Sequence, residues 1–401
     1  MNYLRAVEYL ESFQKMGIRL GLERIRTLLK LLGDPQDKFK SIHIAGTNGK
    51  GSVAAMLSSI LNQAGYWVGL YTSPHLADYT ERIRIKEKDV SRPKFAAAVS
   101  KVKEVIDKLP EMHLTEFEVL TAASFLLMAE EKVDIAVIEV GLGGRLDATN
   151  VIAPILSIIT NIDLDHMDVL GGSIDKIAKE KGGIIKPGVP LVIGERKAWH
   201  ILYNICKEKG SRFIKSNGEK VKYAPFLGRH QAENTKIVLA SVKVLRELGI
   251  KISDPQLIKG LHRAFWPGRL QVIRKDPLMI LDGAHNPAGA RALFKFLSTL
   301  HKKVTFIIGM QKNKDIGSFV KILMPIADRF IVVRSSHPNS LPEEHVAKII
   351  ENAGGRPVIV KDLRNAILLS KSAIKPVCVT GSLYLVGDVL RKNHLTKTAI
   401  F

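Results

Sequence analysis

Short apolar runs alternate with longer amphipathic runs along most of the chain. The short runs are typical of strands, and the longer runs carry apolar residues at helical spacing. Alternation of this kind predicts βα units that share a mainly parallel sheet. The predicted strands of a first series are residues 41–45, 67–71, 133–140, 155–160 and 191–194, and the predicted helices between them are residues 50–64, 94–108, 116–131 and 173–181.

A cluster of residues that break helices, Trp266-Pro267-Gly268, interrupts this alternation after a predicted helix over residues 255–265. A second series follows, with predicted strands at residues 279–281, 304–308, 330–333, 357–360 and 377–380 and predicted helices at residues 287–300 and 343–352. Because 401 residues are too many for one compact core, we expect two domains. The predicted fold is α/β, with a mainly parallel, P-loop NTPase-like domain over residues 1–268 and a smaller Rossmann-like domain over residues 269–401.

The composition argues against several classes of protein. No apolar run approaches the length that crosses a bilayer, and the first residues lack the apolar core of a secretory signal. We therefore expect a cytoplasmic protein with no membrane partner. The two cysteines, Cys206 and Cys378, stand far apart and outside any CxxC pattern, so we expect neither a disulfide framework nor a zinc site.

The formal net charge is +21, and it has three interpretations. The simplest is a lysine-rich solvated surface without a partner. Attraction of a small polyanionic substrate comes second. Binding of nucleic acid comes last, because the basic residues are spread along the chain, are not interleaved with aromatic residues and form no nucleic-acid motif.

The stretch "HIAGTNGKGSVAAML" (residues 43–57) predicts a strand, a glycine loop and a helix. It misses the strict phosphate-loop pattern, because Ile44 stands where the first glycine belongs and Gly51 separates Lys50 from Ser52. Its glycines still allow backbone N–H groups to turn towards an anion, and the helix N-terminus points to the same place. We predict a phosphate-binding loop in which Lys50 reaches the β- and γ-phosphates. A plain glycine turn is the alternative.

A series of short motifs, in family order, resembles the folylpolyglutamate synthase/dihydrofolate synthase family of the Mur ligase superfamily. The motifs are "GTNGKGS" (46–52), "YTSPHL" (71–76), "ERIRI" (81–85), "EVGLGGRLDATN" (139–150), "DLDHMDVLG" (163–171), "KEKGGIIKPG" (179–188), "HQAEN" (230–234), "WPGR" (266–269), "LDGAHNP" (281–287) and "TGSLYLVG" (380–387). The resemblance implies an ATP-binding Mur-ligase-type central domain over residues 1–268 and a C-terminal ligase domain over residues 269–401.

Acidic residues lie at the end of one predicted strand and directly after the next. Glu139 ends a buried-type strand across from the phosphate loop, which is where a magnesium ligand belongs. The alternative for Glu139 is a helix cap or an ion pair with Arg145. After the next strand, the pattern alone would favour Asp163 or Asp165 as the hard-metal ligand.

The resemblance implies a somewhat different set of metal ligands. Ser73, Glu139 and His166 would hold magnesium, with Glu139 bridging two ions. The resemblance also implies that Lys181 reacts with CO2 to give a carbamate that helps to bind magnesium. Carbamylation needs a neutral amine, and hence a pKa lowered by burial or by a neighbouring positive charge. Spacing alone would make Lys181 a surface lysine.

The remaining site residues are also implied by their motifs. The implied catalytic residues are Lys50, His166 and Lys181. The implied ATP-binding residues are Gly46, Thr47, Asn48, Gly49, Lys50, Gly51, Ser52, Asn234, Arg269, Asp282 and His285, and the implied substrate-binding residues are Pro74, His75, Asp147 and Ala148. Helix caps, turns and salt bridges are the alternatives for these residues. For Asp147, with Asn150, a structural turn is nearly as well supported.

The implied reaction is an ATP-dependent ligation. A carboxylate of dihydropteroate or of a folate becomes an acyl phosphate, and the amine of L-glutamate displaces the phosphate. We expect a monomer that uses ATP and two magnesium ions. The alternatives are a peptidoglycan Mur ligase, a nucleic-acid-associated P-loop ATPase and a non-catalytic nucleotide-binding regulator. The loop begins too early for the UDP-sugar-binding domain that precedes it in Mur ligases.

Overall fold

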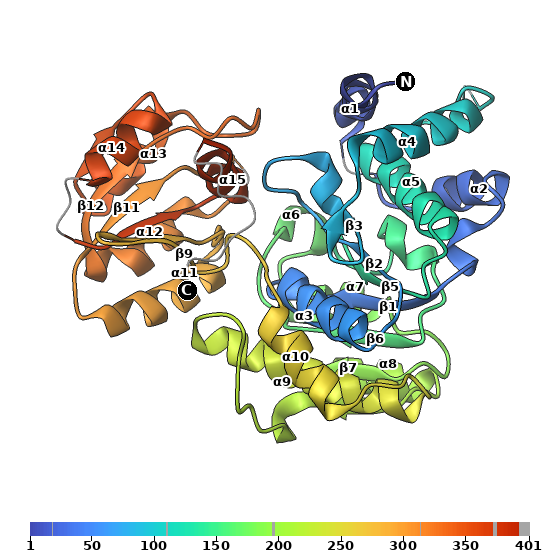
Figure 1. Cartoon of the computed structure of the whole chain (residues 1–401). Helices are drawn as coiled ribbons and strands as arrows, with labels where there is room; N and C mark the ends of the chain where they lie inside the picture. Colours follow the sequence, from blue (N-terminus) through green and yellow to red (C-terminus); the bar gives the residue numbers. More distant parts are fainter. Residues whose placement is uncertain (18, 110, 195–196, 313, 372–374, 393–401) are drawn as a thin grey trace. The chain divides into compact units, whose positions relative to one another are not determined.

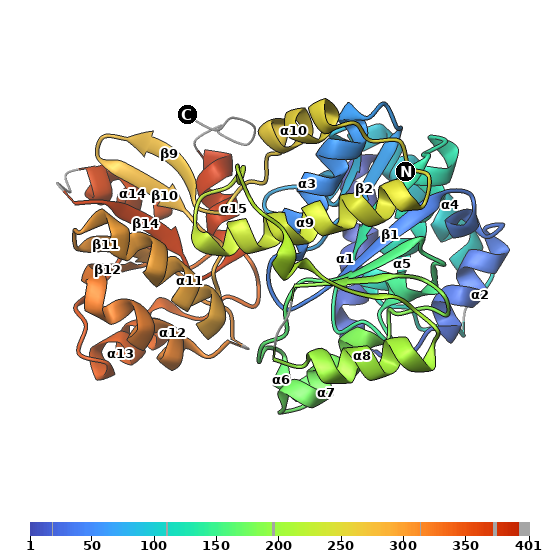
Figure 2. The same cartoon turned by 90° about the horizontal axis from the view of Figure 1, so that it is seen from below.

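The structure is a computed structural model that describes residues 1–17, 19–109, 111–194, 197–312, 314–371 and 375–392. The chain folds into two compact α/β units, each with its own sheet. Unit 1 comprises Met1–Pro74, Asp78–Tyr223 and Glu233–Ala264, and unit 2 comprises His75–Ala77, Ala224–Ala232 and Phe265–Phe401. Figures 1 and 2 trace the chain through both units.

The sheet of unit 1 has the strand order β4-β3-β2-β5-β1-β6-β7-β8. Its strands are β1 (Lys40–Ala45), β2 (Val68–Tyr71), β3 (Ile83–Ile85), β4 (Lys88–Asp89), β5 (Ile135–Glu139), β6 (Leu156–Ile159), β7 (Leu191–Ile193) and β8 (Phe213–Lys215). The strands from β2 to β8 in that order run parallel, and β3 and β4 form an antiparallel hairpin at one edge. The central strands are buried throughout, as expected for parallel strands with helices on both faces.

Helices cover the sheet of unit 1. They are α1 (Tyr3–Ser12), α2 (Glu23–Leu31), α3 (Lys50–Gln63), α4 (Arg92–Ile106), α5 (Glu116–Glu130), α6 (Met167–Leu170), α7 (Ile174–Gly182), α8 (Trp199–Glu208), α9 (Arg229–Glu247) and α10 (Asp254–Arg263). One apolar cluster joins α1, α2, α4 and α5 to the sheet, and another joins α7 and α8 to it. Helix α3 packs so tightly on α10 that a Cβ on Gly260 would lie 2.4 Å from Cα of Ile60.

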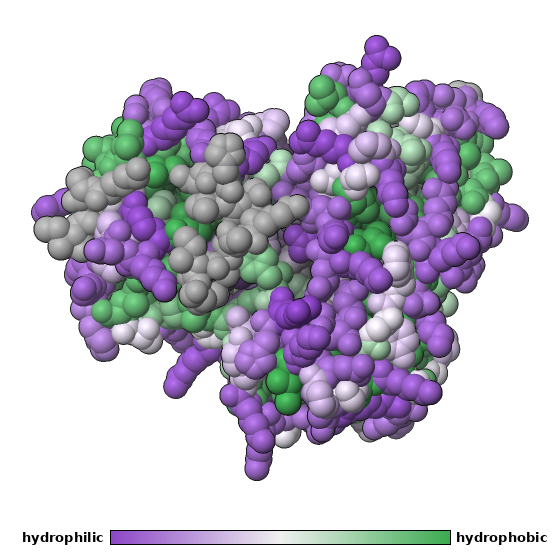
Figure 3. Space-filling model, in the orientation of Figure 1, coloured by the Kyte–Doolittle hydropathy of each residue, from purple (hydrophilic) through white to green (hydrophobic). Residues whose placement is uncertain are grey.

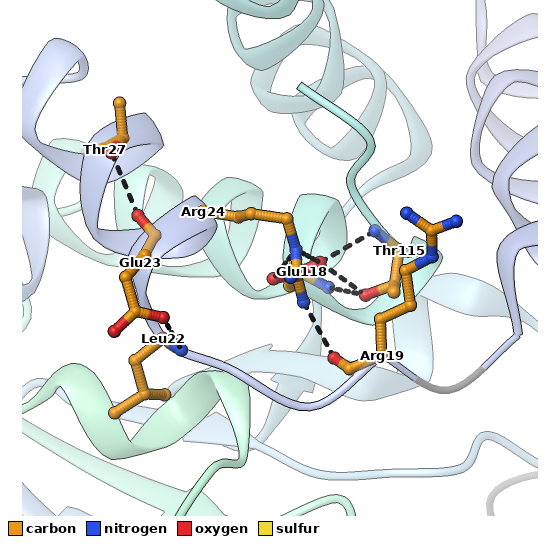
Figure 4. Close-up of polar contacts among 7 residues, drawn as sticks. All are labelled: Arg19, Leu22, Glu23, Arg24, Thr27, Thr115 and Glu118. Atoms are coloured by element: carbon orange, nitrogen blue, oxygen red, sulfur yellow. Dashed lines mark hydrogen bonds and ion pairs between the residues drawn. The ribbon is translucent and has the colours of Figure 1, made fainter. Parts of the chain in front are cut away.

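A polar network joins α2 and the segment before it to α5 (Figure 4). Glu118 is buried in the first turn of α5, where it accepts hydrogen bonds from the backbone N–H and the hydroxyl of Thr115 at 2.8 and 2.9 Å. Arg24 of α2 donates to Glu118 at 3.1 Å and to the backbone carbonyl of Arg19 at 2.8 Å. The capping box at the start of α5 therefore also anchors the segment before α2.

The sheet of unit 2 has the strand order β13-β12-β11-β14-β10-β9, in which only β9 runs antiparallel among the described strands. Its strands are β9 (Gln271–Lys275), β10 (Leu278–Leu281), β11 (Val304–Ile308), β12 (Ala327–Val332), β13 (Pro357–Ile359) and β14 (Val377–Thr380). Its helices are α11 (Pro287–Leu297), α12 (Ile316–Leu323), α13 (Glu343–Asn352), α14 (Leu363–Lys371) and α15 (Leu383–Lys392).

Alternate residues of the unit 2 strands enter two separate apolar clusters. Phe306 and Ile308 of β11 pack with α11, α12 and α13, whereas Ile307 between them packs with α14 and α15. Leu76, from the short segment His75–Ala77, belongs to the second cluster. This two-residue period is the strand pattern that places helices on both faces of a sheet.

The surface in Figure 3 is mainly hydrophilic, with hydrophobic residues in small separate patches. In the part of the chain that the structure describes, no helix is both long enough and apolar enough to span a bilayer.

The predicted fold class is confirmed, because both units have mainly parallel sheets with helices on their faces. The sequence analysis missed β3, β4, β8 and β9. The first three have only two or three residues each and lie at or near sheet edges, where apolar runs are not needed. The predicted domain boundary between residues 268 and 269 stays a prediction. The long segment of unit 2 begins at Phe265, and the unit also includes His75–Ala77 and Ala224–Ala232.

Candidate active site

The glycine loop connects β1 to α3, and two of its glycines have no room for a side chain. Gly46 has a φ of 149°, and a Cβ there would lie 1.8 Å from Oγ1 of Thr160. Gly49 has a φ of 85°, and a Cβ there would lie 2.5 Å from Oδ1 of Asn234 in α9. Both positive φ values favour glycine, so the loop conformation depends on these residues.

The end of β6 holds the loop from the other side. The backbone N–H groups of Thr47 and Asn48 donate to the carbonyl and to Oδ1 of Asn161, at 2.9 and 2.7 Å. The hydroxyl of Thr160 donates to the carbonyl of Asn48 at 2.7 Å, and the backbone N–H of Asp163 donates to Oγ1 of Thr47 at 3.0 Å. The loop is therefore fixed before any ligand binds.

Lys50 and Ser52 lie in the first turn of α3. The amine of Lys50 folds back to donate to the carbonyls of Gly46 and Thr47 at 2.9 and 3.3 Å. Gly49, at the N-cap of α3, makes no side-chain hydrogen bond to the first turn of this helix. A cation and a helix N-terminus at one loop make a place that favours an anion.

Glu139 lies beside the glycine loop because of the strand register. It ends β5, where it is paired with Ile44 of β1, two residues before Gly46. Its side chain is buried, with 5% exposure, and Oε2 accepts a hydrogen bond from the backbone N–H of Ser73 at 3.3 Å. The structure therefore places Ser73 and Glu139 together at the carboxyl edge of the sheet.

His166 starts the short helix α6 with a φ of 50°. Its backbone N–H donates to Oδ1 of Asp165 at 3.0 Å, and its Nε2 lies 3.9 Å from the same oxygen. Asp163, the other acid after β6, lies next to Thr47 through its backbone. Asp163 and Asp165, which the pattern favoured, and His166, which the resemblance implied, therefore all lie on the segment that follows β6.

Lys181 is buried in the last turn of α7, with 4% exposure, so the alternative of a surface lysine is wrong. Burial and the positive charge of Lys50 lower the pKa of the Lys181 amine to about 7, although Asp165 and Asp147 act in the opposite direction. Lys181 is therefore close enough to the glycine loop for its charge to be coupled to that of Lys50. At neutral pH a substantial fraction of this amine is uncharged.

The loop after Glu139 is held largely by Asp147. Its two carboxylate oxygens accept hydrogen bonds from the backbone N–H groups of Leu142 and Thr149, at 2.8 and 3.0 Å. Burial raises the pKa of this carboxyl, and these hydrogen bonds act in the opposite direction. These hydrogen bonds are those expected of the structural turn that is the alternative for Asp147, and both Asp147 and Ala148 are buried.

This loop approaches the end of α7 very closely. A Cβ on Gly183 would lie 2.4 Å from Cα of Arg145, and a Cβ on Gly144 would lie 2.8 Å from the carbonyl oxygen of Glu180. The backbone N–H of Arg145 donates to that same carbonyl at 2.8 Å. The backbone next to Lys181 is therefore packed against the loop.

The predicted residues of unit 2 form a separate group. Asp282 follows β10 and accepts hydrogen bonds from the backbone N–H groups of Leu270 and Ala284, at 2.9 and 3.0 Å. Nδ1 of His285 lies 2.8 Å from the carbonyl oxygen of Gly283. A Cβ on Gly283 would lie 2.3 Å from Nη1 of Arg269. Arg269, Asp282 and His285 are thus neighbours.

Two residues of the "SPHL" motif fall in different units. Pro74 ends a segment of unit 1, whereas His75 belongs to unit 2, where its ring lies edge-on to that of Tyr384 with centroids 6.4 Å apart. The structure therefore does not bring all four predicted substrate residues into one unit.

The chain is similar to known proteins along most of its length. The Mur ligase middle domain family matches residues 44–220, and the family of the dihydrofolate synthetase C-terminal domain matches residues 270–392. The dihydrofolate synthase/folylpolyglutamate synthase of Bacillus subtilis is 34% identical over 97% of this chain and 99% of its own length. A crystal structure of Mycobacterium tuberculosis folylpolyglutamate synthase complexed with ADP and AMPPCP superimposes with a TM-score of 0.90, 30% identity and coverage of 99% and 100% of the two chains.

This chain belongs to the folylpolyglutamate synthase/dihydrofolate synthase family. The family and the ligase class predicted from the motifs are therefore confirmed. The family also includes a bifunctional folylpolyglutamate synthase/dihydrofolate synthase whose crystal structure has Mn, AMPPNP and L-glutamate bound; it superimposes with a TM-score of 0.87 at 31% identity, covering 98% of each chain.

The donor groups present in this family member suit a hard divalent cation. No group of three or more His, Cys, Asp or Glu side chains with metal-binding geometry occurs among the described residues. A serine hydroxyl and a buried carboxylate at Ser73 and Glu139 are oxygen donors of the kind that magnesium and manganese prefer. A carbamate on Lys181 would add a further anionic oxygen donor. Together with His166, these oxygen donors fit a divalent ion.

Sequence reasoning missed several residues that shape the site. Thr160 and Asn161 hold the glycine loop, and His230 is half-buried near Asp282 and Arg269, where its partial burial lowers its pKa. The available signal for Thr160 and Asn161 was their position at and directly after the end of a predicted strand, residues 155–160. For His230 it was its place in the "HQAEN" motif.

Proposed function

We propose that this chain adds L-glutamate to folate acceptors in an ATP-dependent reaction that releases ADP and phosphate. The acceptor is dihydropteroate, which gives dihydrofolate, or a tetrahydrofolate, whose glutamate tail is extended. The observation that carries this proposal is the glycine loop of unit 1, with Glu139 held beside it by the register of β1 and β5. Family membership supports the choice of a folate acceptor.

ATP would place its phosphates on the glycine loop. The N–H groups of the segment from Gly46 to Ser52 and the amine of Lys50 supply positive charge there. Asn234, which lies against Gly49, would contact the nucleotide. In unit 2 we assign Arg269 to phosphate charge, Asp282 to a ribose hydroxyl and His285 to the nucleotide, and the hydrogen bonds of Asp282 and His285 to their own loop hold these side chains in place.

The reaction needs no side-chain nucleophile. A carboxylate oxygen of the acceptor attacks the γ-phosphorus, and the bond from this phosphorus to the ADP oxygen breaks. The amine of glutamate then attacks the acyl carbon, loses a proton and expels inorganic phosphate, which leaves an amide. Lys50 offsets the charge of the transferred phosphoryl group.

Ser73, Glu139 and His166 would hold divalent metal, which we take to be two magnesium ions. When bound, the metal supplies positive charge at the phosphates. The neutral amine of Lys181 can attack CO2, which forms an N–C bond and releases a proton. Its lowered pKa and burial favour this step, because the reacting form of the amine is already populated near pH 7.

We assign the acceptor side of the site to Pro74, His75, Asp147 and Ala148. Asp147 contributes by fixing the loop after β5, as its hydrogen bonds to Leu142 and Thr149 indicate. The predicted monomer and the absence of nucleic acid as a partner stay predictions.

The test is a coupled product assay. The protein is incubated with MgATP, L-glutamate and either dihydropteroate or tetrahydrofolate, and glutamylated product and phosphate are measured by mass spectrometry and colorimetry. We expect one phosphate per new amide bond, with loss of both products in Lys50→Met and little change in Lys38→Met, which alters an exposed lysine. ATP hydrolysis without glutamylated product from either acceptor would contradict the proposal.

A further inference from the structure

His43 is a fully buried histidine in the strand that leads to the glycine loop. It lies in the middle of β1, with 0% exposure, and is paired with Ile138 of β5 and Ser157 of β6. A buried imidazole needs a hydrogen-bond partner to offset its lost hydration. We therefore expect the imidazole of His43 to form a hydrogen bond in the protein interior.

That contact is with the loop after β5. Nε2 of His43 lies 2.9 Å from Oγ1 of Thr149, and this hydroxyl donates to Oδ1 of Asp147 at 2.5 Å. Both oxygens of Asp147 accept hydrogen bonds from backbone N–H groups, so its carboxylate acts as an acceptor. Because the Thr149 hydroxyl has one proton and gives it to Asp147, it can only accept from His43.

The protonation state of His43 follows from this chain of hydrogen bonds. Nε2 must carry the proton, and Nδ1 is buried without a hydrogen bond among the described residues. Burial and the positive charge of Lys186 lower the pKa of His43 to about 3, so the ring is neutral at physiological pH. A neutral ring with its proton on Nε2 is a fixed donor aimed at Thr149.

A second contact reaches the same short segment, the 3-10 turn Ala148–Val151. The amine of Lys186 donates to the carbonyl of Asn150 at 2.8 Å, and Nδ2 of Asn150 donates to the carbonyls of Arg145 and Gly183. The turn that follows Asp147 is thus held from several sides, and His43 provides the contact from β1.

We propose that His43 is a positioning residue that sets the orientation of the Asp147 carboxylate through Thr149, and so couples the strand of the phosphate loop to the loop of the acceptor site. This inference rests on the proposed function in one respect, the assignment of the loop after β5 to the acceptor site. The hydrogen-bond chain itself can be tested in the protein without substrates.

The first test is the tautomer of His43. In protein labelled with 15N-histidine, the side-chain nitrogen shifts of His43, assigned with His43→Gln, should show a neutral ring protonated at Nε2 from pH 6 to pH 8. Thr149→Val should shift the Nε2 signal, whereas Thr121→Val should not. Thr121 is a matched control, because it is buried and its hydroxyl lies 3.0 Å from that of Tyr71. A proton on Nδ1, or a doubly protonated ring, would overturn the proposal whether or not the enzyme ligates glutamate.

The second test is steady-state kinetics with conservative and non-conservative variants. His43→Leu and Thr149→Val should raise KM for the folate acceptor about tenfold, the equivalent of one buried hydrogen bond, and leave KM for ATP within about twofold. His43→Gln, which retains a donor near the place of Nε2, and Thr149→Ser should restore KM. If His43→Leu does not fold, Thr149→Val and Thr149→Ser carry the same comparison. Equal rises in KM for ATP and acceptor, or no rescue by either conservative variant, would overturn the proposal.

Discussion

Gly49 and Asn234 are separated by most of unit 1 in sequence, yet a Cβ on Gly49 would lie 2.5 Å from Oδ1 of Asn234. The loop and helix α9 are therefore fitted to each other at the place where a nucleotide would bind. Any side chain at Gly49 must push Asn234 away, and this provides a direct test of the nucleotide site.

Gly49→Ala should weaken the binding of an ATP analogue at least about tenfold, because it adds a clash with Asn234 to a backbone strain of about 1–2 kcal/mol. Gly65→Ala is the matched control: Gly65 has a φ of 96°, but nothing lies within 4 Å of a Cβ there. Both variants should lose stability in thermal unfolding through backbone strain, Gly49→Ala more than Gly65→Ala because of its clash, and only Gly49→Ala should lose affinity in calorimetry. Equal affinity in the two variants would show that Asn234 does not matter for binding.

Glu139→Gln should lower ligase activity by about a hundredfold or more and weaken its dependence on magnesium, because the amide retains the shape but not the charge of a metal ligand. Activity is measured against magnesium concentration. Glu130→Gln, which alters a carboxylate in an exposed pair with Lys101, should leave the magnesium dependence unchanged. A Glu139→Gln enzyme with normal magnesium dependence would contradict the metal assignment.

Lys181 should make activity depend on CO2 in a pH-dependent manner. Its folded-state pKa of about 7 means that the fraction of reactive neutral amine rises as pH increases through 7. Bicarbonate should restore activity to enzyme stripped of CO2, and 13C-bicarbonate should give a carbamate signal in NMR that is absent in Lys181→Met. Lys179→Met, on the same helix but exposed, should behave like the parent enzyme. A carbamate signal that persists without Lys181 would refute the assignment.

The same group makes a prediction about stability. The folded-state pKa of Lys181, about 7, is below its ordinary value of 10.5, so the unfolded chain binds more protons between these two pH values. The contribution of this lysine to the free energy of unfolding should therefore become more favourable as pH rises from 7 to 10.5. Chemical denaturation of apo enzyme and of Lys181→Met across this range checks the sign. A parallel pH dependence in both proteins would exclude a contribution from Lys181.

Glu118→Ala should destabilise unit 1 by about 2–3 kcal/mol, since it leaves Arg24 without its charged partner and removes the capping box of α5. Glu118 is 3% exposed, whereas Glu131, which pairs with Lys94, is more exposed, so Glu131→Ala should cost less than about 1 kcal/mol. Urea unfolding measures both. Because Arg24 also holds the carbonyl of Arg19, protease cleavage near residues 19–22 should increase in Glu118→Ala (Figure 4).

Much of the fold could be predicted from the sequence because parallel strands are buried on both faces. Residues 304–308 and 377–380 were assigned as strands with the bounds that the structure has, since continuous apolar runs mark them. Strands such as β4 and β8 carry polar or half-exposed residues and are fixed by pairing with a neighbour. The hydropathy pattern of such a short segment does not show which strand it pairs with.

The site was predicted unevenly for a similar reason. The register of β1 and β5 follows from two recognisable strands, so the place of Glu139 beside the loop could be expected. The burial of Lys181 could not, because it depends on α7 meeting a loop from a distant part of the sequence. The contact from His43 to Thr149 likewise spans more than a hundred residues and leaves no trace in the spacing of either motif.

The backbones at Gly183 and Arg145 meet with no space for a methyl group between them. Neither segment can therefore be redesigned alone: a chimaera that imports the "GLGGRLDATN" loop from a relative must also import the matching end of α7. Directed evolution of acceptor preference in this scaffold should accordingly mutate the two segments as one cassette.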